Sequence, residues 1–429
     1  MNWRLFFCLG SSLVVASTFG VLLRTEAEAV EKVSDWPRFR GPDGMGASAA
    51  KDVPLSWGPD ENIVWKTVVP AAGASSPVLF GPHIFLAGYS GFGIPGKAGA
   101  MEQLQRHLIC LDRAGKLLWT KNIASKLPEQ ARIREEHGYA SSTPVVDAER
   151  VYVFFGASGM FAFDHAGNQL WQADCGSALN GWGSAASPIL HGDLVIVNAS
   201  VESTALIALD KKTGKEVWRA GNIREAWNTP LVVKAPDGRA ELIVPVMGKV
   251  LAFDPDSGTP LWTCNTDIPW YMVPSVVAHE GVVFAFGGRP GGSLAVRSGG
   301  KGDVTRTQRL WTSPKGTNVP SPLYHERYLY WMHDALGIAY CAEAQTGRLI
   351  YEERVAGNPS VYASPILADG RIYYLARDGR TFVLAARPKY ELLATNSLGE
   401  RAVFNSSPAV ADGRLYIRSN QYLYCIGTK

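Results

Sequence analysis

Seven short segments of this sequence combine aromatic rings with amide and hydroxyl side chains. They read EEHGYASS, NGWGSAAS, REAWNTP, DIPWYMVP, GTNVPSP, GNPSVYASP and VFNSSP, and they lie between residues 135 and 408. Aromatic rings can stack on a sugar, a quinone or a peptide, and amide groups add directional hydrogen bonds. The candidate ligand-binding residues are therefore His137, Tyr139, Asn180, Trp182, Arg224, Trp227, Asn228, Trp270, Tyr271, Asn318, Asn358, Tyr362 and Asn405. The alternative is that these side chains only shape loops and fill the mouth of a channel.

One residue of these segments could act as a general base. His137 follows two carboxylates, Glu135 and Glu136, and an imidazole changes charge near neutral pH. A single histidine in a long loop is usually solvated, so we assign no catalytic residue.

The cysteines do not indicate a metal site or a disulfide framework. Beyond the N-terminal segment they are Cys110, Cys175, Cys264, Cys341 and Cys425, an odd number at wide spacings without a C-x-x-C pair. Three of them, Cys110, Cys341 and Cys425, fall at comparable points of an internal repeat. We expect small core residues there.

Composition narrows the class of protein. The 429 residues carry a net charge of +3, and the 42 basic residues form no run. Nucleic-acid binding needs clustered Lys and Arg, so we expect no nucleic-acid partner. The 44 Gly, 26 Pro, 13 Trp and 16 Tyr are typical of an all-β protein with short strands and many turns.

An internal repeat sets the architecture. A Ser/Thr-Pro or Val-Pro pair precedes a short apolar run eight times, with prolines at 77, 144, 188, 230, 274, 322, 365 and 408. After a longer first interval the units recur about every 43 residues, which is the length of a propeller blade. In residues 186–221 the pattern predicts strands at 188–190, 194–199, 204–210 and 215–220, joined by tight turns. Eight such units predict an all-β, eight-bladed propeller of four-stranded antiparallel blades.

The stretch ALDKKTGKEVW, residues 208–218, shows the most regular turn of the repeat. Asp210 can accept hydrogen bonds from turn amides, and Gly214 can adopt the positive φ that the reversal needs. Trp218 follows four residues after the glycine, and the same offset recurs at residues 115–119, 167–171 and 258–262. A tryptophan at one position per unit would pack between neighbouring blades. We therefore interpret these tryptophans as structural. Trp227 is off this position, and we place it at the channel mouth, so Trp227→Ala should destabilise the protein far less than Trp218→Ala.

The two ends of the repeat region predict how the ring closes. The eighth unit has no room for a fourth strand, whereas residues 62–69, with Trp65, form an isolated strand near the N-terminus. This strand should complete the last blade and remove the free edge. The predicted organisation is a propeller over 62–429 preceded by an arm over 30–61. Two insertions, 88–106 and 125–141, should share the face that carries the connections between blades.

Residues 1–29 are typical of a secretory signal peptide. Arg4 precedes an apolar stretch, and Ala27 and Ala29 form an A-x-A cleavage pattern. The expected location is the periplasm or the extracellular space, with no transmembrane segment after cleavage. An uncleaved membrane anchor is the alternative.

The pattern A-x-D-x-x-T-G-x-x-x-W is complete at 208–218 and partial in four other units. It resembles the PQQ-like (pyrroloquinoline quinone-like) repeats of quinoprotein dehydrogenases and of the outer-membrane assembly factor BamB. DWPRFRGPDGMG, residues 35–46, is similar to the start of a secreted bacterial family of PQQ-binding-like propeller repeat proteins. The resemblance covers about residues 35–427 and is specific for the fold, while one fold hosts many activities.

The resemblance implies two functions of different classes. Quinoprotein dehydrogenases hold Ca²⁺ with Glu, Asn and Asp oxygens beside PQQ, and many stack the quinone on a disulfide of adjacent cysteines. This sequence has no adjacent cysteines, and no calcium ligands can be matched to it. The leading hypothesis is therefore a secreted, monomeric, noncatalytic scaffold that binds a protein, peptide or glycan and needs no cofactor or metal. The alternative is a PQQ- and Ca²⁺-dependent oxidoreductase acting on alcohols or sugars.

Overall fold

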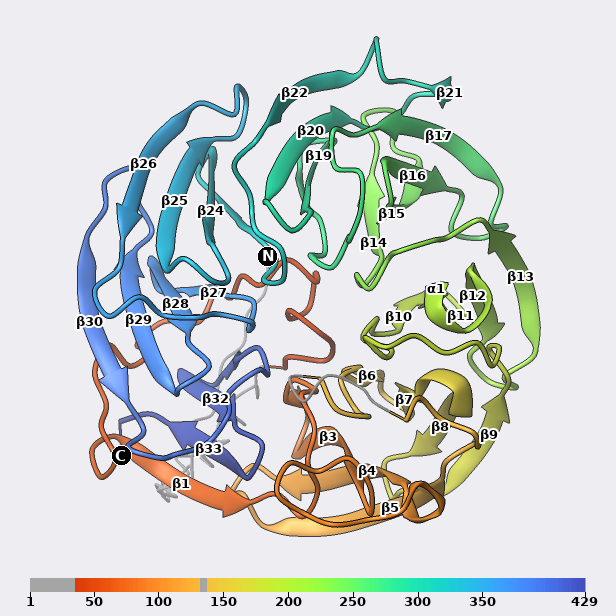
Figure 1. The fold of residues 1–429 in the computed structure, drawn as a ribbon, viewed down its shortest axis with the longest axis vertical. Coiled ribbons are helices and arrows are strands. Elements are labelled where there is room, and N and C mark those ends of the chain that lie inside the picture. Colours follow the sequence, from red (N-terminus) through yellow and green to blue (C-terminus); the bar gives the residue numbers. More distant parts are fainter. Residues whose placement is uncertain (1–34, 132–136, 429) are drawn as a thin grey trace, which may run out of the picture. The chain divides into compact units, whose positions relative to one another are not determined.

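The computed structural model describes residues 35–131 and 137–428, which form eight antiparallel sheets arranged around a common centre (Figure 1). Blades one to four comprise β2 (Val78–Phe80), β3 (His83–Ser90), β4 (Gln105–Asp112) and β5 (Leu117–Ala124); β6 (Val145–Val146), β7 (Arg150–Phe154), β8 (Met160–Asp164) and β9 (Gln169–Ala173); β10 (Ile189–His191), β11 (Leu194–Ala199), β12 (Ala205–Asp210) and β13 (Glu216–Gly221); β14 (Leu231–Lys234), β15 (Ala240–Val246), β16 (Lys249–Phe253) and β17 (Pro260–Asn265). Blades five to eight comprise β18 (Val277–His279), β19 (Val282–Gly287), β20 (Gly292–Arg297) and β22 (Arg309–Ser313); β23 (Leu323–His325), β24 (Tyr328–Met332), β25 (Ile338–Glu343) and β26 (Leu349–Arg354); β27 (Ile366–Ala368), β28 (Arg371–Leu375), β29 (Arg380–Ala385) and β30 (Leu392–Ser397); β31 (Ala409–Ala411), β32 (Arg414–Arg418), β33 (Tyr422–Ile426) and β1 (Ile63–Val68). The predicted all-β, eight-bladed propeller is confirmed.

The N-terminal strand closes the ring as the sequence predicts. β1 pairs antiparallel with β33, with Trp65 opposite Cys425 and Thr67 opposite Leu423. One blade departs from the four-stranded pattern, because the short β21 (Gly302–Asp303) pairs parallel with β17 as a fifth strand. The predicted signal segment, residues 1–29, lies outside the described residues.

Helical structure is confined to connections in the described part of the chain. It consists of α1 (Ser200–Ser203) and two 3-10 turns, η1 (Met101–Gln103) and η2 (Gly156–Ser158). The sequence pattern did not predict α1, which lies in the third blade between β11 and β12. No helix of the described residues is both long and apolar enough to cross a membrane.

Tryptophans of the fourth strands join neighbouring blades through their indole N–H groups. Five of them donate to a backbone oxygen in the turn between the third and fourth strands of the next blade: Trp65 to Arg113 (2.9 Å), Trp119 to His165 (3.3 Å), Trp171 to Lys211 (3.1 Å), Trp218 to Pro255 (3.1 Å) and Trp311 to Ala344 (2.9 Å). Trp262 instead donates to Glu241 Oε2 at 2.7 Å, because a longer connection replaces the turn in the fifth blade. The structural interpretation of these tryptophans is confirmed.

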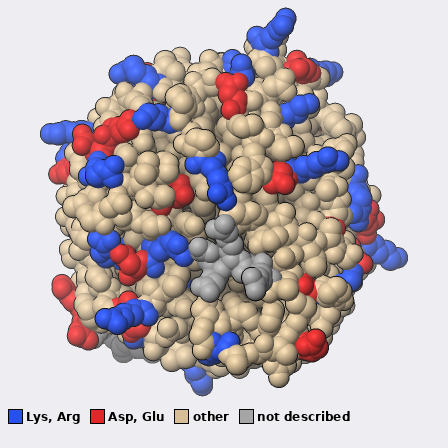
Figure 2. Space-filling view, in the orientation of Figure 1, with Lys and Arg blue, Asp and Glu red and all other residues tan. Residues whose placement is uncertain are grey.

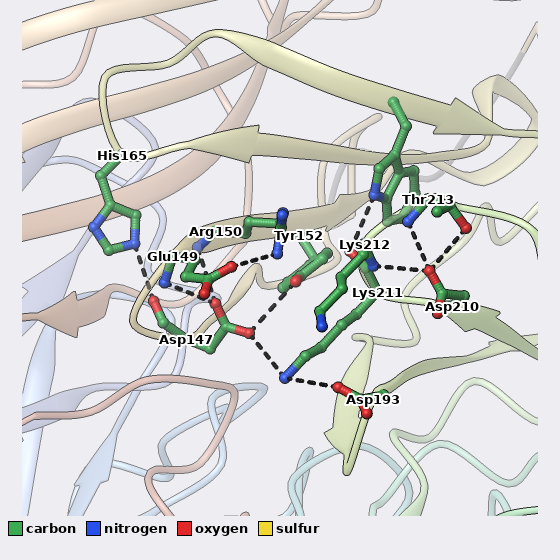
Figure 3. Close-up of polar contacts among 11 residues, drawn as sticks. Asp147, Glu149, Arg150, Tyr152, His165, Asp193, Asp210, Lys211, Lys212 and Thr213 are labelled. Carbon is green, nitrogen blue, oxygen red and sulfur yellow. Dashed lines mark hydrogen bonds and ion pairs between the residues drawn. The ribbon is translucent and has the colours of Figure 1, made fainter.

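The regular turn explains why a glycine stands four residues before Trp119, Trp171, Trp218 and Trp262. Asp210 Oδ1 accepts the backbone N–H and the hydroxyl of Thr213 at 2.8 and 2.7 Å, and Lys211 forms ion pairs with Asp147 and Asp193 (Figure 3). Gly214 has φ +73°, and a Cβ there would lie 2.7 Å from the ring of Trp171 in the preceding blade. The glycine is therefore required both by the turn and by the indole that packs on it.

The residue opposite each fourth-strand aromatic is small. Cys110, Cys341 and Cys425 are paired with Trp119, Tyr351 and Trp65, and alanines occupy this third-strand position at 162, 208, 252 and 295. All five described cysteines are buried and free. The prediction that Cys110, Cys341 and Cys425 are small core residues is confirmed, since each is fully buried opposite an aromatic ring.

The arm preceding β1 crosses the face that carries the tight turns, and its red trace reaches the middle of the ring in Figure 1. Trp36 is 1% exposed and exchanges backbone hydrogen bonds with Leu79 of blade one. Arg40, also 1% exposed, donates to the backbone oxygen of Pro322 beside blade six, and Ser48 bonds Leu367 of blade seven. The arm thus ties together blades that are far apart in the sequence. Phe39, between these anchors, lines the central channel.

Candidate functional site

The face opposite the tight turns carries both long insertions, and we call it the loop face. The insertions extend the connections from β3 to β4 and from β5 to β6, which confirms that they share one face. Arg106 and Glu129 join them through an ion pair whose side chains are 4% and 7% exposed, and Phe92 packs on Tyr139 at 5.8 Å between ring centres. The loop face is therefore built by packed rather than isolated loops.

A cavity of about 950 Å³ opens on the loop face between the last and the first blade. Residues 68–74 and 420–422 form its walls, together with Lys97, His137 and Arg377. Two exposed apolar side chains also line it, Val68 at 67% and Val403 at 40% exposure. Among the described residues its lining contains no Asp or Glu. A volume of this size is typical of a ligand pocket.

A ring of hydroxyl residues surrounds the central channel next to this cavity. It consists of Ser76, Thr143, Ser187, Thr229, Ser275, Ser321, Ser364 and Ser407. The backbone N–H of each member donates to the hydroxyl oxygen of the next at 2.9 to 3.1 Å, and the bond from Ser407 to Ser76 completes the circle. The ring therefore satisfies one buried N–H per blade and links every blade to its neighbour.

The ring corrects one position of the sequence repeat. In the fifth blade the residue equivalent to the Ser/Thr of the other Ser/Thr-Pro pairs is Ser275, so the position equivalent to the proline is Val276, two residues after the Pro274 that the repeat pattern matched. Sequence spacing alone did not show this shift, because a proline stands on the wrong side of the serine. The channel itself is narrow, about 100 Å³.

Four predicted aromatic residues form one cluster on the loop face. Tyr271 lies 5.3 Å from Trp182, 5.2 Å from Trp227 and 5.3 Å from Trp270, measured between ring centres. Arg289 lies over three of these rings, at 5.2 Å from Trp182 and Trp270 and 5.7 Å from Tyr271. The cluster therefore holds a guanidinium group against three of its rings.

The structure contradicts the expected exposure of Trp227. Its side chain is only 6% exposed, and its indole N–H donates to the backbone oxygen of Gly183 at 2.9 Å. It lines the channel as predicted, but it is as buried as Trp218, at 7%. Contacts with Tyr271 cover the ring, which spacing along the chain could not reveal.

A second cluster lies between the channel and the cavity. The ring of His137 stacks on Tyr362 at 6.3 Å and meets the edge of Trp182 at 6.0 Å. The guanidinium group of Arg377 lies over the same Tyr362 ring, 4.4 Å from its centre. The Nε of Arg377 donates to Asn405 Oδ1 at 3.1 Å. Through Trp182 the two clusters are continuous across the loop face. Glu135 and Glu136, which precede the histidine, lie outside the described residues.

The other predicted residues do not join these clusters. Tyr139 is buried and donates to the backbone of Gln130, and Asn180 accepts the N–H of Trp182 within its own turn. Asn228 is 1% exposed and donates to the backbone oxygens of Pro245 and Met272.

Three further predicted residues lie at the edges of the connections. Arg224 is exposed, Asn358 accepts from Arg354 at 2.8 Å, and the backbone of Asn318 donates to Asp334. These contacts are local, and they support the alternative that part of the predicted set shapes loops.

Sequence reasoning missed two arginines. Arg289 and Arg377 lie in connections from the second to the third strand, on the same face as the blade-to-blade connections that carry the predicted residues. The sequence did contain a local indication of these positions, since each arginine stands beside a glycine or aspartate turn in a short loop. Their contacts with rings from other blades are long-range and leave no trace in the local spacing.

A buried carboxyl lies beneath the second insertion. Glu202 of α1 is 4% exposed and accepts a hydrogen bond from the Ser184 hydroxyl. Burial raises the pKa of Glu202 to about 7. The adjacent space, lined by Arg106, Glu129 and Ser184, is only about 20 Å³, which is enough for a water molecule and too small for an organic ligand.

The described residues of the channel mouth do not fit a calcium ion. Ca²⁺ prefers six or more oxygens with carboxylates among them. Neither the channel nor the cavity is lined by a described Asp or Glu, and Arg377 and Lys97 would repel a cation. In the described part of the chain no group of three His, Cys, Asp or Glu side chains is placed to hold a metal.

Comparison with known families gives one match over most of the chain. The model described as "Outer membrane protein assembly factor BamB" matches residues 58–229, 200–333 and 246–387. The quinoprotein alcohol dehydrogenase PedH of Pseudomonas putida is 29% identical over 185 residues, which cover 39% of this chain. That match spans only 28% of the dehydrogenase.

Solved structures agree on the fold. BamB from Moraxella catarrhalis superposes with a TM-score of 0.59 at 14% identity, covering 85% of this chain and 99% of that one. The quinohemoprotein alcohol dehydrogenase from Comamonas testosteroni gives 0.64 at 12% identity, covering 92% and 81%. An assembly factor and dehydrogenases thus share this propeller, so the fold alone does not distinguish the two functions.

Proposed function

The chain belongs to the PQQ-like β-propeller family whose model is described as outer membrane protein assembly factor BamB, and from that premise we propose that it is a noncatalytic binding scaffold. Its ligand would be a protein, peptide or glycan held on the loop face. The observation that carries this proposal is the cavity of about 950 Å³ between the last and first blades, which has cationic and apolar lining but no described carboxylate.

A scaffold of this kind needs no reacting group. It needs a rigid frame and side chains that are oriented before the ligand arrives. The hydroxyl ring and the fourth-strand tryptophans supply the frame. The stacked His137, Tyr362 and Arg377 supply orientation at the edge of the cavity.

We further propose that the protein is exported and monomeric. The N-terminal pattern of residues 1–29 supports export. N-terminal sequencing of protein from the periplasm or medium should give a chain that starts near Val30, and recovery of the intact N-terminus in the membrane would favour the anchor.

The second candidate is a PQQ-dependent oxidoreductase acting on alcohols or sugars. The 29% identity to a quinoprotein alcohol dehydrogenase favours it. If this reading were right, PQQ would need a cation beside its reactive carbonyl. A noncatalytic scaffold needs no cation. The described residues that line the channel and the cavity argue against a calcium site.

Calorimetry with PQQ, with and without Ca²⁺, separates the two candidates when it is combined with a dye-reduction assay on simple alcohols and aldoses. We expect weak, calcium-independent PQQ binding and no turnover. Calcium-dependent binding in the micromolar range, or turnover of any of these substrates, would replace the scaffold with the dehydrogenase.

A further inference from the structure

We propose that the cavity between the last and first blades binds an acidic peptide segment with apolar neighbours, and that Arg377 holds one of its carboxylates. This inference rests on the proposed scaffold function and adds the chemistry of the partner. It is carried by an arginine whose Nη groups have no ion-pair partner among the described residues, by the apolar side chains beside it and by the coverage of the described aromatic rings at the cavity.

Arg377 differs from the other arginines of its blade. Arg371, Arg380 and Arg387 each pair with a carboxylate, from Asp369, Asp378 and Glu391 respectively. Among the residues that the structure describes, the side chain of Arg377 hydrogen-bonds only through Nε, to the neutral Asn405 Oδ1, and its Nη groups form no ion pair. A half-buried guanidinium without a counter-charge is suited to receive one from a ligand.

The contacts of Arg377 also fix its direction. Its guanidinium lies on the Tyr362 ring at 4.4 Å while Asn405 holds Nε, so the remaining two nitrogens are the ones available to the cavity that Arg377 lines. A planar group held in this way can bond both oxygens of a carboxylate. Lys97 lines the same cavity and adds a second positive charge.

The apolar lining indicates that charge is only part of the ligand. Val68 and Val403 are 67% and 40% exposed, and Ile94 and Pro95 lie in the same wall. Burying these side chains would contribute to binding. A ligand that carries carboxylates beside apolar groups satisfies both parts of the lining.

A peptide fits better than an acidic sugar. Sugar rings are recognised through open aromatic faces. In the cavity, Tyr89 is 3% exposed and Tyr422 is covered by Lys66 Nζ at 4.1 Å, while His137 and Arg377 cover Tyr362 beside it. An extended peptide needs no such platform, since its side chains alternate between the two kinds of lining.

Fluorescence anisotropy with labelled octapeptides tests the inference. The probes are an alternating Asp/Leu peptide, its Asn/Leu and Lys/Leu counterparts, and an oligomer of a uronic acid. We expect the Asp/Leu peptide to bind most tightly and to weaken with added salt. Arg377→Gln should raise its Kd at least about tenfold, as expected when a charged hydrogen-bond partner is lost.

Arg380→Gln is the matched control. Arg380 belongs to the same blade and also lies over an aromatic ring, Phe382 at 5.3 Å, but it is paired with Asp378 and does not line the cavity. Its substitution should change the Kd less than about twofold, within the usual range for distant surface residues. Lys97→Gln serves as a second cavity variant, and thermal melting verifies that each variant is folded.

Each other outcome has a defined meaning. Equal binding of the Asn/Leu peptide, or an unchanged Kd in Arg377→Gln, overturns the role of Arg377 while leaving a peptide scaffold in place. Binding of the uronic acid alone replaces the peptide with a glycan. Binding of none of these probes overturns the inference, and the PQQ assays above then decide separately whether the scaffold itself is wrong.

Discussion

The turn face and the loop face of this propeller follow different rules. On the turn face blades one to four repeat one arrangement, in which an aspartate caps a turn, a glycine contacts the indole of the preceding blade and that indole donates to a backbone oxygen of the turn. On the loop face the connections differ in length and composition from blade to blade. The repeated turns and tryptophans join neighbouring blades and so stabilise the ring. The connections that differ between blades are the parts of the molecule that a ligand can recognise.

Charge follows the same division. On the turn face Lys211 pairs with Asp147 and Asp193, while on the loop face Arg289 and Arg377 contact aromatic rings instead of described carboxylates. In the view of Figure 2, the Lys and Arg side chains of the described residues are interspersed with Asp and Glu around the edge. Arg289 and Arg377, which have no ion-pair partner among the described residues, are therefore local cationic features and, in this view, not part of a broad basic surface.

The largest effect should come from removing the segment that both closes the ring and spans the turn face. A chain that begins at Ala71 lacks β1, Trp65 and the anchors Trp36 and Arg40. The last blade would expose an unpaired strand edge, and the core would lose large buried side chains. We expect this chain to aggregate or to melt without a cooperative transition.

Circular dichroism melts of chains starting at Val30 and at Ala71 provide the measurement. A similar melting temperature for both would mean that the propeller is complete without β1.

The next largest effect should come from the buried tryptophans. They test whether the stability lost on substitution depends on how buried the side chain is or on which face of the propeller it belongs to. Trp218→Ala on the turn side should lower the free energy of unfolding by about 3–5 kcal/mol. The sequence placed Trp227 at the channel mouth and predicted a far smaller loss, but its 6% exposure corrects this, and we now expect a loss in the same range. Trp270, 38% exposed, should cost about 1 kcal/mol.

Denaturant unfolding of the three alanine variants provides the comparison. If Trp227→Ala lowered the free energy of unfolding no more than Trp270→Ala, burial would not determine the loss of stability. The contacts of the loop face would then stabilise the protein less than those of the turn face.

These tryptophans show what the sequence could predict. The repeat, the turn chemistry and the closing strand are local patterns, so Asp210, Gly214 and the strand containing Trp65 were assigned correctly. Burial of Trp227 depends on Tyr271 from another blade, and the roles of Arg289 and Arg377 depend on rings contributed by distant connections. Such contacts arise only when the ring closes, so the fold was predictable and the detail of the site was not.

A smaller, pH-dependent effect should come from Glu202 beneath the second insertion. Burial raises its pKa from 4.5 to about 7, so between these values the folded chain holds a proton that the unfolded chain has released. The free energy of unfolding should therefore fall as pH rises from about 4.5 to 7 and then level off, by at most about 3 kcal/mol.

Glu202→Gln removes this titration while keeping an oxygen for the Ser184 hydroxyl. The variant should match the wild type near pH 4.5 and exceed it in stability at pH 8. Glu216→Gln, on an exposed strand position, is the control and should leave the pH profile unchanged. A Glu202→Gln profile parallel to the wild type would show that the carboxyl is not protonated in the folded chain at neutral pH.

The smallest loss of stability should come from substitution of Arg289. A matching substitution of Arg113 compares an arginine of the loop face with one of the turn face. On the turn face Arg113 donates to Gly81 at 2.8 Å and pairs with Asp35 and Asp412, which belong to the arm and the last blade. Arg113→Ala should lower stability by about 1–3 kcal/mol because it breaks charged hydrogen bonds between segments. Arg289 is exposed, and its side-chain contacts with described residues are the aromatic rings of the cluster, so Arg289→Ala should cost less than about 1 kcal/mol. Thermal unfolding of both variants measures the difference, and an equal loss would mean that the aromatic cluster holds the fifth blade together rather than presenting a cation to a ligand.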